Sequence, residues 1–287
     1  MNYRHAYHAG NFGDVLKHAT LALVIEHLKQ KPAPFRVIDT HAGVGLYELD
    51  NGPAEKTEEW RQGIGRLYGP DAKPPPKELV PLLAPYFAAV TAENAPGELR
   101  RYPGSPRLAR TLMRQQDRLI VNELHPQDGL ALKELFARDA QTKVLQLDGW
   151  IALKSLLPPK ERRGVILVDP PYEQPGELER LAKGLREATS RFPTGIYLLW
   201  YPIKDPRVIE TFHKAVTALN LQKLLVAELM IRRPRDVTRL NGTGLLMLNP
   251  PYRLDGMLAA LLPFFASRLG EGPDASHRLI WLTGEPD

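Results

Sequence analysis

Cysteine is absent from this chain, which excludes disulfides, cysteine-ligated zinc sites and thiol catalysis. No apolar run approaches the roughly 18 residues of a membrane span. Residues 1–5 also lack the apolar stretch that a secretory signal needs. Nothing in the composition points to an oxidising compartment. We therefore expect a cytoplasmic protein that does not associate with membranes.

A phosphate-binding glycine motif is also missing. Residues 43–48, with the sequence GVGLYE, supply two of the three glycines of a dinucleotide fingerprint, and Glu48 in the third place would repel phosphate. No Gly-Lys-Ser or Gly-Lys-Thr follows, so a P-loop is disfavoured as well. Asp39, shortly before these glycines, suits a ligand that carries amine and hydroxyl donors without phosphates. S-adenosylmethionine is such a ligand.

Metal ligands are sparse. His5 and His8 lie close together in the sequence, but no further ligands accompany them, and we expect no metal site. The polar, aromatic and basic character of this N-terminal segment instead predicts contact with a substrate.

The composition is that of an ordinary globular protein. A length of 287 residues with 43% apolar content predicts one large α/β domain, with room for an inserted subdomain. Lys and Arg number 38 against 33 Asp and Glu, and the pI is near 9.3. This modest basic excess favours anionic partners such as nucleic acid.

Four carboxylates each close a separate predicted strand in a repeating strand–helix pattern. They are Asp39, Glu123, Asp148 and Asp169. Each acid taken singly could instead cap a helix. Together they predict a doubly wound sheet with a ligand crevice at the carboxyl ends of its strands. In that crevice Glu123 is placed to bind a ribose diol, and Asp148 to accept from an adenine amine.

The loop Asp169-Pro170-Pro171-Tyr172 follows the apolar run 165–168 and is the candidate catalytic element. The Asp169 carboxylate and the Pro170 carbonyl could accept both protons of an exocyclic amine, while Tyr172 stacks on its ring. Proline fixes φ near −65° and lacks an N–H, so such a loop has little freedom to lose. The alternative is a Pro-Pro strand terminator without catalytic function.

A second candidate, Asn249-Pro250-Pro251-Tyr252, has a similar sequence. The strands 223–231 and 244–248 are expected to form a terminal antiparallel hairpin. Asn249 would then lie at the edge opposite the carboxyl ends of the first four strands, far from the Gly43 loop. We therefore favour Asp169 and interpret Asn249 as part of a turn.

The segment 50–101 is interpreted as an inserted helical subdomain, with helices around 55–68 and 77–93 and no sheet strand. The main domain then comprises 1–49 and 102–287. Its first 30 residues include a helix expected from about Asp14 to Lys29, and a later helix is expected to begin at Ser105 and Pro106. An independent domain is the weaker alternative, because about 50 residues bury little core by themselves.

Two groups of arginines could contact phosphates. One is the loop of Arg232, Arg233 and Arg235, for which a merely solvated loop is the alternative. The other group lies on the helix after Ser105, where a solvated face is the commoner explanation. Its members are Arg107, Arg110 and Arg114.

Several motifs carry a family resemblance across nearly the whole chain. The segment 39–43 resembles motif I, residues 169–172 motif IV and the N-terminal segment motif X of Rossmann-like, S-adenosylmethionine-dependent amino-methyltransferases. More narrowly, the chain resembles the RlmJ family, bacterial methyltransferases of adenine N6 in 23S ribosomal RNA. The narrower motifs are Tyr3-Arg4-His5, His8-Ala9-Gly10-Asn11, Asp14-Val15-Leu16-Lys17-His18, Tyr102-Pro103-Gly104-Ser105-Pro106, Glu123-Leu124-His125-Pro126, and Gly195-Ile196-Tyr197 with Trp200-Tyr201-Pro202.

The resemblance implies a class I methyltransferase fold that methylates a single adenine of 23S rRNA, of the adenine 2030 type, in free or immature rRNA. It implies a monomer, with Asp169, Pro170 and Tyr172 as catalytic residues. Tyr3, His5 and Lys17 would lie near the substrate. Cofactor contacts would fall on Lys17, His18, His41, Gly43, Ser105, Glu123, Asp148 and Asp169.

Two other functions remain open. The same catalytic loop serves any planar amine, so a DNA adenine-N6 or protein glutamine methyltransferase is possible on the motif alone. A catalytically silent RNA-binding assembly factor that keeps S-adenosylmethionine as a structural ligand is the alternative outside enzymes. The full set of strand-end acids argues against it.

Overall fold

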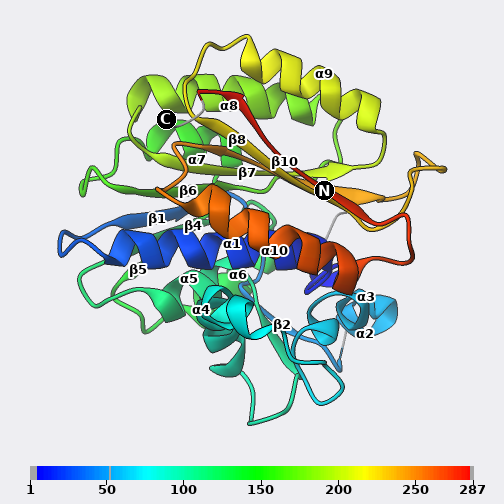
Figure 1. Ribbon diagram of the computed structural model, residues 1–287. Coiled ribbons are helices and arrows are strands. Elements are labelled where there is room, and N and C mark those ends of the chain that lie inside the picture. The colour runs from blue at the N-terminus through cyan, green and yellow to red at the C-terminus, as the bar shows by residue number, and fades with distance from the viewer. Residues whose placement is uncertain (1–4, 52, 285–287) are drawn as a thin grey trace.

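In the computed structural model, which describes residues 5–51 and 53–284, helices cover both faces of one sheet (Figure 1). The strands of this sheet are β1 (Arg36–Asp39), β4 (Arg118–Asn122), β5 (Thr142–Leu145), β6 (Gly164–Val168), β7 (Ile196–Ile203), β8 (Leu224–Met230), β9 (Gly242–Leu248) and β10 (Ser276–Thr283). Their order is β10-β8-β9-β7-β6-β1-β4-β5.

The first five of these strands in the sequence are parallel to one another. Strand β9 is antiparallel to both β7 and β8, and β10 is antiparallel to β8. The expected doubly wound sheet with antiparallel final strands is therefore confirmed. Because the five parallel strands end at one edge, the loops that follow β1, β4, β5 and β6 meet there.

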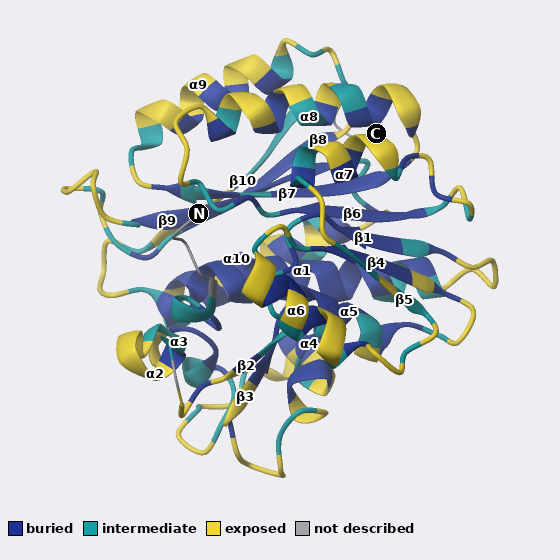
Figure 2. Ribbon diagram, turned by 180° about the vertical axis from the view of Figure 1, so that it is seen from behind, coloured by how far each residue is buried: buried dark blue, intermediate teal, exposed yellow. Residues whose placement is uncertain are grey.

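Two hydrophobic clusters hold the helices to the sheet. One face carries α1 (Phe12–Lys29), α5 (Ser105–Leu112), α6 (Pro126–Leu135) and α10 (Leu254–Leu269). The other face carries α7 (Gly149–Ser155), α8 (Glu177–Arg191) and α9 (Pro206–Thr217). The central strands are buried between these two layers, whereas the edge strands β5 and β10 are partly exposed (Figure 2).

Helix α1 is buried along almost its whole length, because the sheet, α5 and α10 all pack against it. Its cap is Asn11, whose side chain accepts from the Gly13 and Asp14 amides. The expected start at Asp14 was therefore wrong. The Asp14 carboxylate instead accepts from the Gly10 amide at 2.8 Å, one turn back along the chain. Ser105 was likewise expected to cap α5, but Gly104 is the cap and Ser105 is the first helical residue.

The segment 50–101 contains short helices: α2 (Pro53–Thr57), α3 (Glu59–Gln62), η2 (Ile64–Arg66), η3 (Lys77–Leu79) and α4 (Val80–Thr91). At its base β2 (Leu46–Glu48) pairs antiparallel with β3 (Arg101–Pro103), a ribbon that the sequence did not predict. Leu83, Tyr86 and Val90 of α4 are buried in the same cluster as α1 and α5. The segment thus shares its core with the main sheet.

Asn249 lies where the topology argument predicted. Its side-chain amide donates to the carbonyls of Pro193 and Gly195, both at 2.8 Å, just before β7 begins. That is the edge opposite the carboxyl ends of the parallel strands. The sequence of residues 249–252 therefore forms a turn away from the Gly43 loop.

The three arginines on and after α5 do not present free charge to a phosphate. Arg107 pairs with Glu93 at 2.6 Å, and Arg110 with Asp139 at 2.5 Å. Arg114 pairs with the fully buried Asp117 at 3.0 Å. Phosphate contact stays a prediction for this group, in which each guanidinium already pairs with a carboxylate of the protein.

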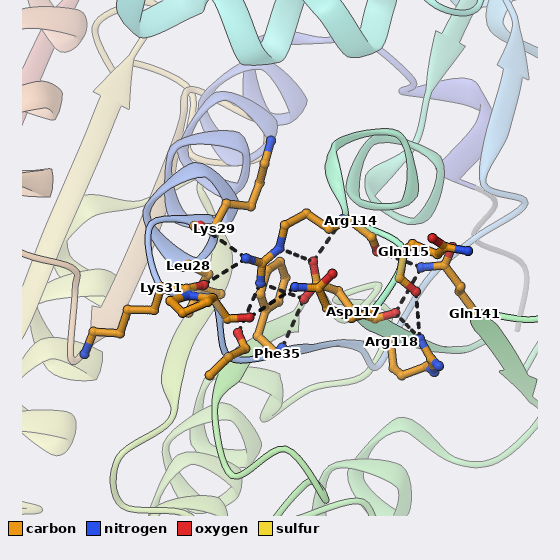
Figure 3. Close-up of polar contacts among 12 residues, drawn as sticks. Leu28, Lys29, Lys31, Phe35, Arg114, Gln115, Asp117, Arg118 and Gln141 are labelled. Atoms are coloured by element: carbon orange, nitrogen blue, oxygen red, sulfur yellow. Dashed lines mark hydrogen bonds and ion pairs between the residues drawn. The ribbon is translucent and has the colours of Figure 1, made fainter.

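Arg114 and Asp117 form the centre of a polar network at the sheet edge opposite the four loops (Figure 3). The guanidinium donates to the carbonyls of Lys31 at 2.8 Å and Ala33 at 3.1 Å, in the connection from α1 to β1. The Asp117 carboxylate also accepts from the Phe35 amide at 3.2 Å. The network therefore fixes where α1 ends and β1 begins.

We expect Asp117→Ala to lower the free energy of unfolding by roughly 3 kcal/mol, because it leaves a buried amide and a guanidinium without their acceptor. Urea denaturation measures this change. Asp50→Ala is the control, because Asp50 is exposed and forms only a long ion pair, at 3.8 Å, with Arg100. Its effect on the free energy of unfolding should stay within roughly 0.5 kcal/mol. Equal stability of the two variants would contradict this assignment.

Candidate active site

A cavity opens at the edge where the loops after β1, β4, β5 and β6 meet. The structure brings together in its lining all eight residues expected to contact a cofactor. They are Lys17, His18, His41, Gly43, Ser105, Glu123, Asp148 and Asp169. The parallel strand order explains why His41, Gly43, Glu123, Asp148 and Asp169 converge, while α1 and α5 supply the other three.

Gly43 and Glu123 form one wall of the cavity. Gly43 has φ +61°, and a Cβ there would lie 2.4 Å from the Tyr47 hydroxyl, so glycine is required. Its amide donates to Glu123 Oε2 at 2.8 Å, and the His125 amide donates to Oε1 at 2.8 Å. Burial raises the pKa of Glu123, although these two hydrogen bonds oppose the rise. The carboxylate is thus held in one orientation at the cavity wall, where its remaining lone pairs can accept from a diol.

Asp148 closes the far end of the cavity. One oxygen, Oδ1, caps α7 by accepting from the Trp150 and Ile151 amides at 2.9 and 3.1 Å. The helix-capping alternative is therefore correct for this oxygen, and the residue lines the cavity as well. His41 lies against Trp150 edge to face, with ring centroids 5.7 Å apart. Burial lowers the pKa of His41 to about 4, so the His41 imidazole is neutral at physiological pH.

Asp39 supports the cavity from below and is outside its lining. It accepts from the Ser105 hydroxyl at 2.6 Å and from the His41 amide at 3.2 Å. Burial raises the pKa of Asp39 to about 6. The first strand-end acid therefore positions two lining residues.

Two buried charges, on Lys17 and Asp14, and the partly buried Asp169 connect α1 with the candidate catalytic loop. The Lys17 ammonium is 2.8 Å from Asp14 Oδ1 and also contacts Asp169 Oδ2. Burial alone would lower the pKa of Lys17, but the two carboxylates outweigh it and the pKa is raised. Lys17 therefore remains an ammonium, with its side chain only 3% exposed. It also lies 5.8 Å from the centre of the Trp200 ring.

His18 lines the same side of the cavity. Its ring stacks on Tyr102 with centroids 5.5 Å apart, and Nδ1 is 2.7 Å from the Tyr102 hydroxyl. Tyr102 in turn lies 3.0 Å from the Tyr86 hydroxyl of α4. The segment 50–101 thus supports a cavity residue.

Pro170 lines the cavity, whereas Tyr172 does not. Tyr172 has φ +53°, and its hydroxyl donates to the Trp200 carbonyl at 2.7 Å. Its ring meets Trp200 edge to face, 5.6 Å between centroids. The role of Tyr172 in stacking on a target ring remains a prediction.

Arg232, Arg233 and Arg235 lie outside the cavity lining. Tyr3 is outside the described residues, and His5 begins the short helix η1 (His5–Tyr7). In the loop after β8, Arg232 pairs with Glu271 at 2.6 Å, and Arg235 is 3.9 Å from Asp274. This loop follows β8 at the same edge of the sheet as the cavity, since β8 runs parallel to β7.

Several lining residues were missed from the sequence, chiefly Trp150, Glu173, Gln174, Glu177 and Arg180. Glu177 is buried, which raises its pKa, and it pairs with Arg180 at 2.9 Å. Their positions in the sequence could have predicted them. Four of the five lie within eight residues after the catalytic loop, and Trp150 lies two residues after Asp148.

Within the described ranges, 5–51 and 53–284, no group of three or more His, Cys, Asp or Glu residues is placed to hold a metal ion. None of the helices in these ranges has the length and apolar character needed to cross a membrane.

Comparisons with known proteins place this geometry in context. A family described as "RsmJ: Ribosomal RNA large subunit methyltransferase D, RlmJ" matches residues 32–283. The chain is 39% identical to ribosomal RNA large subunit methyltransferase J of Escherichia coli K12, over 99% of this chain and 100% of that protein. For the protein of the same name from Haemophilus influenzae the identity is 38%, with the same coverage. The crystal structure of protein LPL1258 from Legionella pneumophila is similar with a TM-score of 0.86 and 32% identity, covering 96% of this chain and 98% of that one.

Asp39 gives a pH-dependent prediction. Because its folded pKa is about 6 and its ordinary value is 3.8, the folded protein holds a proton that the unfolded chain releases between these values. The Asp39 contribution to stability therefore falls as pH rises from about 4 to about 6, by at most about 1.4 kcal/mol per pH unit.

Asp39→Asn removes this titration. The free energy of unfolding of the variant, relative to the wild type, should rise between pH 4 and pH 6 and level off above that range. Urea denaturation at several pH values measures the difference. A constant difference across the range would show that Asp39 titrates normally in the fold.

Proposed function

This chain belongs to the RlmJ family of ribosomal RNA large subunit methyltransferases, and we propose that it transfers a methyl group from S-adenosylmethionine to N6 of a single adenine in 23S ribosomal RNA. The observation that carries this proposal is the Asp169-Pro170-Pro171-Tyr172 loop, which closes β6 beside the cavity with a buried ammonium behind its carboxylate. We propose free or immature rRNA as the substrate of a cytoplasmic monomer.

The cavity suits S-adenosylmethionine, which carries an amine, a ribose diol and a positively charged sulfur. Among the described residues, six lining side chains are carboxylic acids and only Lys17 and Arg180 are permanent cations. Glu123 is oriented to accept from the diol, and Asp148 and the His41–Trp150 wall suit an adenine ring. This acidic lining favours a cationic ligand over a phosphate-bearing one.

The main contribution of the protein to the reaction is to position the adenine amine. When bound, S-adenosylmethionine supplies an electrophilic methyl group. The Asp169 carboxylate and the Pro170 carbonyl accept the two protons of the adenine amine, which aligns its nitrogen with that methyl group. Asp169 stabilises the positive charge that develops on the nitrogen, and after transfer the nitrogen loses one proton to solvent water. Such preorganised acceptors contribute much of a typical rate enhancement.

Lys17 fixes the orientation of this carboxylate. Its ammonium contacts Asp169 Oδ2 and leaves Oδ1 to face the amine. The Asp14 carboxylate on the other side of Lys17 fixes the ammonium in place. Lys17 therefore acts on the substrate indirectly, by positioning Asp169.

The adenine must leave its stack to reach Asp169, and unpaired RNA lowers the free energy needed. We propose that Tyr172, Tyr3 and His5 contact the extruded base, and that Arg233 and Arg235 bind flanking phosphates. Arg232 is the weakest of the three arginine candidates, since Glu271 and the Leu240 carbonyl already hold its guanidinium.

Asp169→Asn should lower kcat by roughly 100-fold or more, because it replaces a charged acceptor with a neutral amide. Transfer of tritiated methyl groups is measured in parallel on 23S rRNA, duplex DNA and a protein mixture, and we expect label in rRNA alone. Asp71→Asn, at an exposed position, is the charge-matched control and should retain full activity. Full activity of Asp169→Asn with unchanged cofactor affinity, or label in DNA or protein instead, would refute the proposal.

The arginine loop is tested by its response to salt. Replacing Arg233 and Arg235 with Ala should raise KM for rRNA on the order of tenfold and reduce the slope of log KM against log salt by about one to two, as expected for lost phosphate contacts. The double variant with Ala at Arg186 and Arg191, on α8, is the control. An unchanged salt slope would mean that this loop is only solvated.

A further inference from the structure

The carboxylate of Glu59, in the inserted segment, holds two residues of the N-terminal segment. Its Oε1 lies 3.0 Å from His8 Nδ1, and its Oε2 accepts from the Asn11 side-chain amide at 3.0 Å. The side chains of His8 and Glu59 are 36% and 37% exposed. Burial would raise the pKa of Glu59, but the hydrogen bonds with His8 and Asn11 outweigh it and lower the pKa. Glu59 is therefore an anion at neutral pH.

The backbones of the two segments also meet directly. The Ile64 amide donates to the Gly10 carbonyl at 2.8 Å. A Cβ on Gly63 would lie 2.0 Å from that carbonyl oxygen, and Gly10 itself has φ +75°. Glycine is therefore required at both positions. At Gly63 a side chain would collide with the Gly10 carbonyl, and at Gly10 the backbone adopts a left-handed conformation. The Thr57 hydroxyl adds a hydrogen bond to the Tyr7 carbonyl.

From this contact a continuous series of interactions leads to the catalytic loop. Asn11 caps α1, and the Gly10 amide donates to Asp14 Oδ2 at 2.8 Å. The other oxygen of Asp14 is 2.8 Å from the Lys17 ammonium, which contacts Asp169. The residues that Glu59 holds are therefore those that set the first turn of α1, and so the place of Lys17.

We propose that Glu59 is a positioning residue that fixes the N-terminal segment and the first turn of α1 for RNA binding. This inference rests on the proposed function. The inserted segment then supports the N-terminal segment through the Glu59 carboxylate and the contact at Gly10. Without Glu59, residues 5–11 must become ordered when RNA binds, and the conformational entropy lost then weakens RNA binding. The loss should therefore appear in KM for RNA more than in kcat.

The test is a double-mutant cycle on His8 and Glu59 in the full chain. We expect Glu59→Ala and His8→Ala each to raise KM for a 23S rRNA fragment by roughly 5- to 20-fold, with the double variant no worse than the more impaired single variant. Glu59→Gln, which keeps an acceptor for Asn11, should recover part of the loss. The dissociation constant for S-adenosylmethionine should stay within twofold.

The control is Glu48 and Arg101, an exposed ion pair at 2.8 Å in the ribbon at the base of the same inserted segment. Arg101→Ala should leave KM unchanged. Amide hydrogen exchange of residues 7–13 gives a readout that is independent of activity, and it should be faster in Glu59→Ala than in Arg101→Ala.

The outcomes separate the two proposals. If the two effects on KM multiply, or if Glu59→Ala lowers the melting temperature without changing KM or exchange, Glu59 is not a positioning residue for RNA binding. If the wild type transfers no methyl group to rRNA while Glu59→Ala still speeds exchange, the proposed function is wrong and the structural role of Glu59 in ordering residues 7–13 stands.

Discussion

The structure depends on one buried ammonium, that of Lys17, held between the carboxylates of Asp14 and Asp169. A charge this deeply buried without partners would destabilise the fold by several kcal/mol, so α1 and the loop after β6 must stay in register with each other. The Asn11 cap sets where α1 starts, and the Arg114–Asp117 network fixes where it ends. The same ammonium holds Oδ2 of the Asp169 carboxylate. Stability and chemistry therefore place the same demand on α1.

The sheet order turns dispersed acids into one site. Strands β5, β4, β1 and β6 are adjacent and parallel, so Glu123, Asp148 and Asp169 converge at a common edge, while Asp39 supports them from beneath. The insertion of β9 between β7 and β8 reverses the direction of the chain at the other end of the sheet. This reversal sends the sequence similar to the catalytic loop, at Asn249, to the opposite edge.

The sequence predicted what depends on strand ends and local motifs. The acids after the strands, the Gly43 turn and the placement of the Asp169 loop follow from parallel topology, which alternating strands and helices already indicate. Partners distant in sequence could not be predicted. Arg107, Arg110 and Arg114 look like free cations until tertiary structure pairs them with Glu93, Asp139 and Asp117. Asp14 looks like a cap, but the turn at Gly10 makes Asn11 the cap. Neither the helix α10 nor the strand β10 was predicted from the sequence. For α10 the reason is an apolar run that contains Pro263 and shows no helical period.

The central claim is that this cavity and the Asp169 loop methylate one adenine of 23S rRNA. The most direct measurement is mass spectrometry of 23S rRNA fragments from cells that lack this protein, complemented with either the wild type or the Asp169→Asn variant. The account predicts that one N6-methyladenine disappears without the protein, returns with the wild type and stays absent with the variant. An unchanged set of rRNA methyl groups in cells that lack the protein would contradict it.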